Sequence, residues 1–271
     1  MIDLEYLPIS ITACGLILLW TLESWAPAVV DRRDRLWHAV RNLTLGLLNG
    51  AALALLAAPL LALFAVWAEN SGFGLLRALR LPPAVATALA VLLFDGWMYL
   101  WHRANHEIPF LWRFHRVHHG DPEMDATTAV RFHLGEILIS SALRLAVVPL
   151  LGISLRQLLI YEALLLPVIL FHHGNVNFPE KLDRRLRVAL VSPAIHRIHH
   201  SRVKVETNSN YASVFSFWDR IMGTLRLREN GRPVNFGLDD FDGEEWQRVP
   251  GMLTAPFAPN LATGFDHRFG R

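Results

Sequence analysis

Histidine is the residue whose spacing stands out in this chain of 271 residues. Eleven of its 13 histidines fall between positions 102 and 200, while His38 and His267 stand apart. Residues 113–120 read RFHRVHHG and residues 194–201 read AIHRIHHS, so a His, two residues and a His pair occur twice. Side chains three and four positions apart share one face of a helix. Each pattern therefore predicts a short helix that presents three imidazoles on one side.

Two further groups of histidines join these two. One lies in WHRANHE, at positions i and i+4, and the other is the pair in FHHGN, while His133 in RFHLGE is a further candidate. The four groups are His102 and His106; His115, His118 and His119; His172 and His173; and His196, His199 and His200. Neutral imidazole binds zinc, copper, iron and nickel. Protonated histidines this close would repel one another, so the grouping predicts a shared metal site.

The number of imidazoles predicts more than one ion. Eight histidines in the three helically spaced groups exceed the six ligands of an octahedral ion, and a structural zinc site needs only four. Arg103 rather than Glu follows His102, which excludes the HExxH pattern of zinc peptidases. The single cysteine, Cys14, excludes a cysteine-built zinc site and an intramolecular disulfide. We therefore expect two ions that each keep an open position, as in a catalytic pair.

The elements that must position these histidines are strongly apolar. The chain is 52% hydrophobic and 18% charged, whereas soluble domains are about 25% charged. Five apolar stretches occupy residues 6–22, 43–68, 84–101, 134–151 and 155–171. A transmembrane helix needs about 20 such residues, and the last two stretches are shorter and contain charges. The sequence predicts an all-α integral membrane helical bundle, of about four spans or of three spans plus a hairpin, with a cytoplasmic histidine-rich cap.

The orientation follows from the basic loop between the first two stretches. This loop contains Arg32, Arg33, Arg35 and Arg41. By the positive-inside rule it is cytoplasmic, so residues 102–133 and 172–271 lie on the cytoplasmic side. We expect a multi-pass integral membrane protein with a cytoplasmic active site, in the inner membrane if the source is bacterial. The net charge of +2 indicates no nucleic-acid partner.

Three regions follow from these patterns. We expect N-terminal transmembrane helices in residues 1–83, a catalytic region with a membrane hairpin in residues 84–230, and a C-terminal cytoplasmic tail in residues 231–271. The histidines cap the spans where a lipid chain could enter sideways from the bilayer. A metal pair that binds oxygen there would meet unactivated C–H bonds, and iron is the ion for that reaction.

Several motifs carry a family resemblance. HRANH, HRVHH and HRIHH resemble the histidine boxes of the fatty acid hydroxylase / sterol desaturase superfamily of membrane di-iron enzymes. RFHLGE is similar to the RxHPxE stretch of that superfamily, with Leu134 in place of Pro, and FHHGNV is similar to its FxHxNV stretch. The resemblance covers about residues 85 to 257.

The resemblance implies a set of site residues. The implied metal ligands are His102, His106, His115, His118, His119, His173, His196, His199 and His200. His133 and His172 are further candidates, either as ligands or as partners of ligands. Asp95, Glu136 and Asn175 are implied as hydrogen-bond partners that fix the tautomers of ligand rings.

The resemblance also implies a reaction. Its cofactor would be two iron ions (Fe2+/Fe3+), with O2 as co-substrate and electrons from a separate donor such as a ferredoxin, a cytochrome or a reductase. The substrate would be a lipid from the bilayer, such as a sterol, a fatty acyl chain or an ether lipid, that is hydroxylated or desaturated. The alternative is a zinc-binding membrane protein or metal transporter without redox chemistry. Transport requires polar ligands near mid-membrane, whereas these histidines lie at span ends or beyond.

Overall fold

The computed structural model describes residues 7–30, 34–228 and 234–258. Arg32, Arg33 and His267 lie outside the described residues. Within these ranges the chain forms helices and loops with isolated β-bridges and no β-strand. The predicted all-α fold is confirmed.

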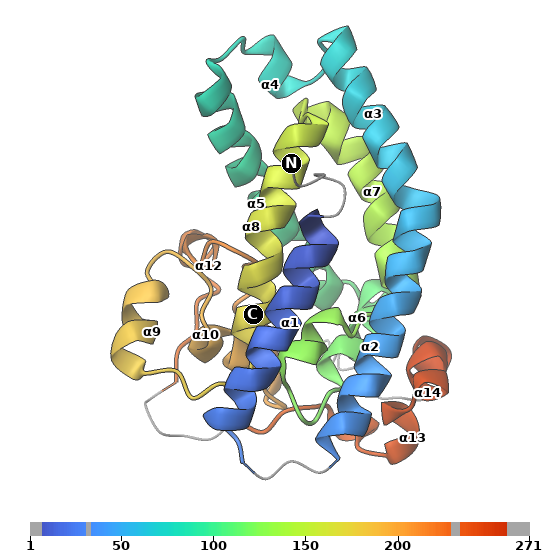
Figure 1. Cartoon of the computed structure of the whole chain (residues 1–271), viewed down its shortest axis with the longest axis vertical. Coiled ribbons are helices and arrows are strands. Elements are labelled where there is room, and N and C mark those ends of the chain that lie inside the picture. The colour runs from blue at the N-terminus through green and yellow to red at the C-terminus, as the bar shows by residue number, and fades with distance from the viewer. Residues whose placement is uncertain (1–6, 31–33, 229–233, 259–271) are drawn as a thin grey trace, which may run out of the picture.

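Among the described residues, five helical stretches are long and apolar enough to cross a membrane. They are α1 (Leu7–Trp25), the stretch Arg35–Ala78, α5 (Pro83–Glu107), α7 (Leu134–Leu151) and α8 (Leu155–His173). The second stretch comprises α2 (Arg35–Ala52), η2 (Leu53–Ala57), α3 (Ala58–Ser71) and α4 (Leu75–Ala78). Figure 1 shows these helices running between an end that carries α4 and an end that carries the short helices. Both halves of the expected hairpin, α7 and α8, are each long and apolar enough to cross a membrane. The number of bilayer crossings stays a prediction.

The helices α2, η2 and α3 form one rod. Pro59, near the start of α3, has no N–H to donate to the preceding turn, and the five residues before α3 form a π-helical turn, η2. The rod packs against α7, and its first half also packs against η3 (Ala126–Val130). The rod therefore links the membrane bundle to the cap.

A sharp corner separates α5 from α6 (Pro109–His119). A residue before proline is disfavoured in the helical region, and Ile108 is extended, with φ −97° and ψ 113°. Pro109 then starts α6, where its missing N–H leaves no intrahelical bond unmade. The corner turns α6 back against α5 and brings the histidines of the two helices face to face.

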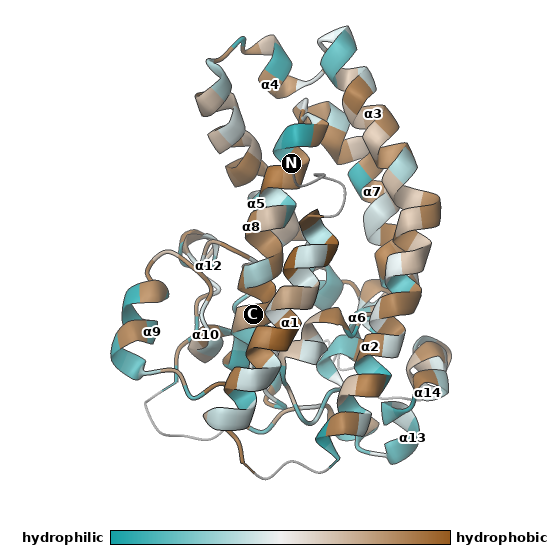
Figure 2. Ribbon diagram, viewed as in Figure 1, coloured by the Kyte–Doolittle hydropathy of each residue, from teal (hydrophilic) through white to brown (hydrophobic). Residues whose placement is uncertain are grey.

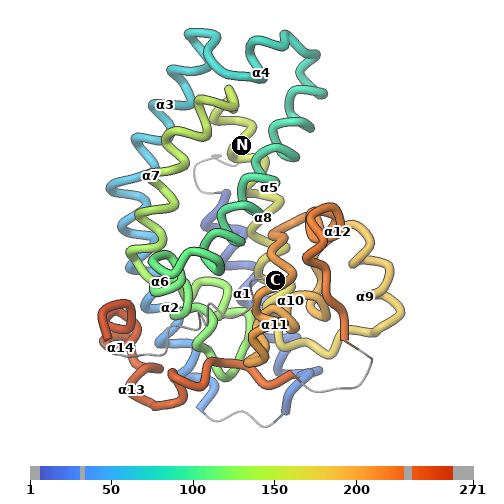
Figure 3. The backbone as a smooth tube through the Cα atoms, turned by 180° about the vertical axis from the view of Figure 1, so that it is seen from behind, coloured from blue at the N-terminus to red at the C-terminus, as the bar shows by residue number. Residues whose placement is uncertain are grey.

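Short helices make up the rest of the cap. They are α9 (Glu180–Leu186), α10 (Pro193–His199), α11 (Lys204–Thr207), α12 (Phe217–Ile221), η4 (Asp239–Phe241), α13 (Glu244–Gln247), α14 (Val249–Thr254) and η5 (Ala255–Phe257). From behind, Figure 3 shows α9 to α12 on one side of this end and α13 with α14 on the other. Phe241 and Met252 pack with Leu45 and Val117 in a separate apolar cluster. The described part of the C-terminal region is thus packed on α2 and α6.

The long helices carry their apolar residues outward as well as inward. Leu47, Leu55 and Leu63 on the rod are 75%, 77% and 63% exposed, which suits contact with lipid rather than water. Figure 2 shows hydrophobic residues along α1, the rod, α7 and α8, and hydrophilic residues on α13. The protein is a multi-pass membrane protein. Which face of the membrane carries the cap stays a prediction.

Candidate metal centre

Nine histidines that are far apart in the sequence converge in two groups. The five-histidine group is His102, His106, His115, His119 and His199, and the four-histidine group is His118, His173, His196 and His200. Within each group, one nitrogen from every ring lies within 4.8 Å of the others. The rings of His119 and His200 stack at 4.4 Å between centroids, so the two groups are neighbours. These are the nine residues implied as ligands.

Backbone carbonyls fix the tautomers of several rings. The Nδ1 atoms of His102, His199 and His173 lie 2.8, 2.7 and 2.7 Å from the carbonyl oxygens of Tyr211, Ser209 and Ile169, respectively. A carbonyl oxygen can only accept, so each of these Nδ1 atoms carries the hydrogen. Each ring therefore keeps a bare lone pair on Nε2.

The bare lone pairs face one another. The Nε2 atoms of His102 and His199 are 3.0 Å apart, and because both rings are protonated at Nδ1 this contact cannot be a hydrogen bond. Two ligands at about 2.1 Å from one ion, set at right angles, are about 3 Å apart. The geometry suits a cation between the two nitrogens.

The four-histidine group repeats this arrangement. The Nε2 atom of His173 is 3.2 Å from that of His118 and 3.0 Å from that of His196. The Nδ1 atoms of His118, His196 and His200 are buried without a hydrogen-bond partner. The Nε2 atoms of His196 and His200 are also 3.2 Å apart, so a metal in this group would bind the facing Nε2 atoms.

Burial keeps the rings of His119, His199 and His200 neutral. In the cap, burial lowers the pKa of His199 to about 3, and burial lowers the pKa of His119 and His200 well below the usual value, with further lowering by neighbouring histidines. Neutral imidazole is the form that binds metal. The donor set of both groups therefore fits divalent ions.

The three residues implied as hydrogen-bond partners of the ligands have different partners in the structure. Glu136 Oε1 accepts from His115 Nδ1 at 2.9 Å, which holds that ring in place. Asp95 instead accepts from the Tyr161 hydroxyl, the Trp218 indole and the backbone N–H of Phe215.

Asn175 likewise has no histidine partner among its described contacts. Its side chain bonds to both backbone groups of Val29, and its N–H donates to Glu23. Asp95 and Asn175 therefore tie loops to helices. Their expected role beside the ligand rings is corrected, because tertiary packing directs them to other segments.

His133 and His172 lie outside both histidine groups. His133 Nδ1 accepts from the N–H of Gly135 and caps α7, while its Nε2 donates to the carbonyl of Leu253. The His172 ring lies 3.9 Å from that of His196, between centroids, and lines the cavity described below. His133 is thus a helix cap, and His172 is a neighbour of the four-histidine group.

The histidine pattern in the sequence does not predict a buried polar cluster that lies beside the site. His38, which stands alone in the sequence, places Nε2 2.8 Å from Asp121 and Nδ1 3.3 Å from Asp125. Asn42 donates to Asp121 as well. Positive charge on His38 and Arg131 holds the pKa of the Asp121 carboxyl well below its usual range, despite burial. This cluster fixes the loop after His119 to the rod.

A cavity of about 390 Å³ opens beside the histidines. Its wall includes His102, His118 and His173 at one end and apolar side chains such as Leu165 and Ile169 from α8. Gly46 and Gly50 from α2 and Thr12 from α1 also line it, so the cavity reaches the membrane-facing helices. A volume of this size, mostly apolar with a few polar groups, is typical of a small-molecule site.

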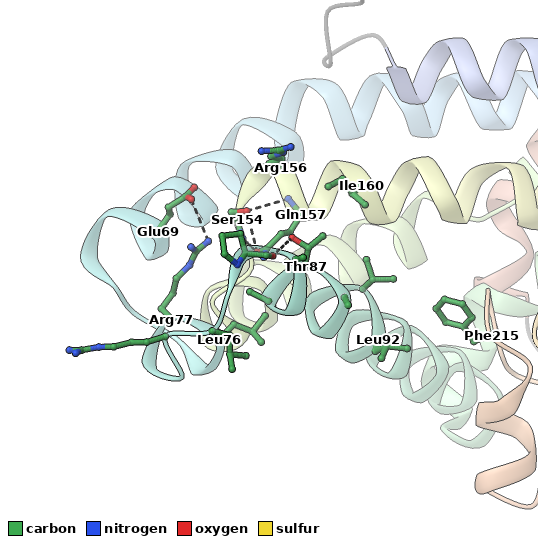
Figure 4. A pocket seen from close by; sticks show the side chains of 17 residues that line it. Glu69, Leu76, Arg77, Thr87, Leu92, Ser154, Arg156, Gln157, Ile160 and Phe215 are labelled. Atoms are coloured by element: carbon green, nitrogen blue, oxygen red, sulfur yellow. Dashed lines mark hydrogen bonds and ion pairs between the residues drawn. The ribbon is translucent and has the colours of Figure 1, made fainter.

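A larger cavity, of about 980 Å³, lies at the opposite end of the bundle. Figure 4 shows Glu69 of α3, Arg77 of α4, and Arg156 and Gln157 of α8 around it. It is lined by no histidine. The chemistry therefore belongs to the smaller cavity.

A sequence profile described as Fatty acid hydroxylase matches residues 87–224, which are 138 of the 271 residues and contain every histidine of both groups. The chain belongs to the fatty acid hydroxylase family. The family resemblance drawn from the histidine boxes is confirmed. No solved structure matches the chain at a significant level.

Curated relatives of this fatty acid hydroxylase family member share the histidine region. An ornithine lipid hydroxylase of Rhizobium tropici is 33% identical over 177 residues, or 65% of this chain and 52% of that protein. Cholesterol 25-hydroxylase of Homo sapiens is 30% identical over 50% of this chain and 49% of its own length. Alkylglycerol monooxygenase of Homo sapiens is 30% identical over 55% and 32%, respectively. The chain spans about half the length of these relatives, or less.

Proposed function

We propose that this chain is a membrane-bound, O2-dependent oxidoreductase that hydroxylates a lipid, with two iron ions as its cofactor. The observation that carries the proposal is the convergence of nine imidazoles in two adjoining groups beside an apolar cavity. The names of these three relatives, two hydroxylases and a monooxygenase, support it.

The two histidine groups would each hold one ion. The five-histidine group leaves at most one position of an octahedral ion open, and the four-histidine group leaves two, so a co-substrate has room to bind. The chemistry that a bound iron pair supplies is the oxidation of an unactivated C–H bond with O2. The ring positions are held by the carbonyls of Tyr211, Ser209 and Ile169 and by Glu136, which hydrogen bond to the ligands through Nδ1.

The cavity would hold the lipid with a C–H bond near the histidines. Leu165, Ile169 and Leu170 give it an apolar wall that excludes water and receives an alkyl chain. Its membrane-facing wall of α1 and α2 residues supports entry from the bilayer. Hydroxylation is favoured over desaturation because the names of the three relatives describe hydroxylases and a monooxygenase.

The remaining parts of the proposal concern topology and partners. The start of α2, which carries Arg35 and Arg41, lies at the cap end, and this supports a cytoplasmic centre by the positive-inside rule. Electrons would come from a separate ferredoxin, cytochrome or reductase. We retain the division into residues 1–83, 84–230 and 231–271 as the working domain scheme.

Metal analysis and lipid mass spectrometry together test the proposal. We expect two irons per chain in protein purified without a metal-affinity tag, and a lipid that gains one oxygen atom in cells that express it. His118→Ala should abolish the product, because His118 belongs to the four-histidine group. Zinc alone, with no oxygen uptake in any reductant, would instead support the zinc-binding or transporter alternative.

A further inference from the structure

An ion pair lies in the wall of the histidine cavity. Arg144 on α7 donates through Nη1 to Glu162 Oε1 on α8 at 2.9 Å, and both residues line the cavity. Their side chains are 20% and 22% exposed, well inside two of the membrane helices. Charged residues at such positions are expensive, and they mark functional sites more often than structural ones.

The pair leaves hydrogen-bonding capacity unused. Arg144 Nη2 reaches the thioether sulfur of Met98 at 3.2 Å, which is a weak acceptor, and Arg144 Nε is buried without a partner. In the described part of the chain, Glu162 Oε2 accepts no hydrogen bond. The cavity wall therefore offers a weakly bonded donor, Arg144 Nη2, beside a free acceptor, Glu162 Oε2.

The pair is offset from the histidines along the bundle. On α7, Arg144 follows Glu136, the partner of His115, by eight residues, or about 12 Å of helix. On α5, Met98 precedes His102 by four residues, or about 6 Å. A lipid that fills the cavity would thus reach from the pair to the ligand groups over about 6 to 12 Å.

We propose that Arg144 and Glu162 hold an uncharged hydrogen-bonding group of the lipid, such as a hydroxyl, and so set which carbon lies at the histidines. This inference rests on the proposed function. A hydroxyl can accept from the guanidinium and donate to the carboxylate at once. A carboxylate or phosphate would be repelled by Glu162, and a plain hydrocarbon would leave both charges unsatisfied.

Binding of matched sixteen-carbon probes to the metal-free full chain tests this role. The probes are 1-hexadecanol, hexadecanoate and hexadecane, each competing with a fluorescent alkyl ligand. We expect wild type to prefer the alcohol over both competitors. Arg144→Gln and Glu162→Gln should each reduce this preference about tenfold or more, since a hydrogen bond to a charged group contributes about 1.5–3 kcal/mol.

The opposite cavity provides a matched control. Arg77 and Glu69 form an Arg–Glu pair at 3.5 Å in that cavity (Figure 4). Arg77→Gln removes a charge of the same kind from a site that lacks histidines, and should leave the alcohol preference unchanged. If Arg144→Gln does not fold, Arg144→Lys keeps the ion pair but removes the second guanidinium donor, Nη2, and should still lower the preference severalfold.

The inference is overturned if folded variants at both positions keep the full alcohol preference, or if wild type prefers hexadecanoate. Thermal unfolding of each variant separates a lost contact from a lost fold. A wild type that prefers the alcohol but oxidises no lipid contradicts the proposed function and still supports the recognition role. A wild type that oxidises lipid, with variants that bind all three probes as it does, contradicts the recognition role alone.

Discussion

The facing Nε2 atoms of His102 and His199 are the contact that argues most directly for a bound metal. Both rings donate Nδ1–H to backbone carbonyls, so their lone pairs would repel across 3.0 Å without a cation between them. The cap is thus preorganised for metal, and metal binding should stabilise it.

Removing one ring should therefore reduce metal binding without preventing the protein from folding. We expect His199→Ala to lower the metal content of the purified protein and its thermal stability with metal present. His133→Ala is the matched control, since His133 caps α7 outside both groups and its loss should cost about 1 kcal/mol with metal content unchanged. Equal metal content in the two variants would argue against the ligand assignment.

Glu136 tests the partners of the ligands. Glu136→Gln keeps the size of the side chain but removes the charge that orients His115. Loss of such a partner typically costs 10- to 100-fold in metal affinity or activity. Titration of the metal-free protein with Fe2+ measures this directly, and an unchanged affinity would mean that the contact is not needed for binding.

The sequence predicts the ligand histidines better than it predicts the groups that hydrogen bond to them. Helical spacing predicts which histidines share a face, and nine of them converge. The acceptors at Tyr211, Ser209 and Ile169 are backbone carbonyls, which carry no residue-type signal. Asp95 shares the helix face of His102 in sequence, yet the Trp218 indole of α12 and the backbone N–H of Phe215 donate to its carboxylate.

Among the elements, α2 has one face in the cavity. A Cβ added to Gly50 would meet no atom within 4 Å, whereas one added to Gly46 would lie 3.0 Å from Val130. Gly50→Phe should therefore fold and bind metal while its ring occupies space that the lipid needs. We expect lower lipid oxidation with unchanged metal content, measured against Gly50→Ala, which should gain up to about 1 kcal/mol of helix stability. Undiminished oxidation in Gly50→Phe would place the lipid elsewhere.

Element boundaries show what hydropathy can and cannot predict. The expected stretch 43–68 becomes a rod that begins at Arg35, because a helix can continue past the bilayer into polar sequence that a hydropathy pattern excludes. The corner at Ile108 and Pro109 can be predicted from the sequence, because a proline disfavours the helical conformation of the residue before it. The packing of residues 238–257 on α2 and α6 is tertiary, which is why a tail without a core was expected there.

For the whole molecule, Gln247 joins the C-terminal part of the cap to the segments that follow α6 and η3. It accepts from Arg131 at 2.8 Å and donates to the carbonyls of Gly120 and Phe241. Gln247→Ala leaves a buried guanidinium N–H without this acceptor, at a cost of about 1–3 kcal/mol. We expect faster protease cleavage after residue 233 with the histidine groups intact. Cleavage at the wild-type rate would mean that the apolar cluster alone holds this region.

The rod of α2, η2 and α3 runs 37 residues, from Arg35 to Ser71, or about 55 Å, nearly twice the roughly 30 Å of a hydrocarbon core. The rod cannot shorten, so a change in bilayer thickness must change how much of its length lies outside the lipid. The cap that holds the histidine groups is packed on this rod. Membrane thickness therefore sets the position of these groups relative to the lipid. Turnover in vesicles of graded acyl-chain length should pass through an optimum where lipid tails meet the cavity mouth.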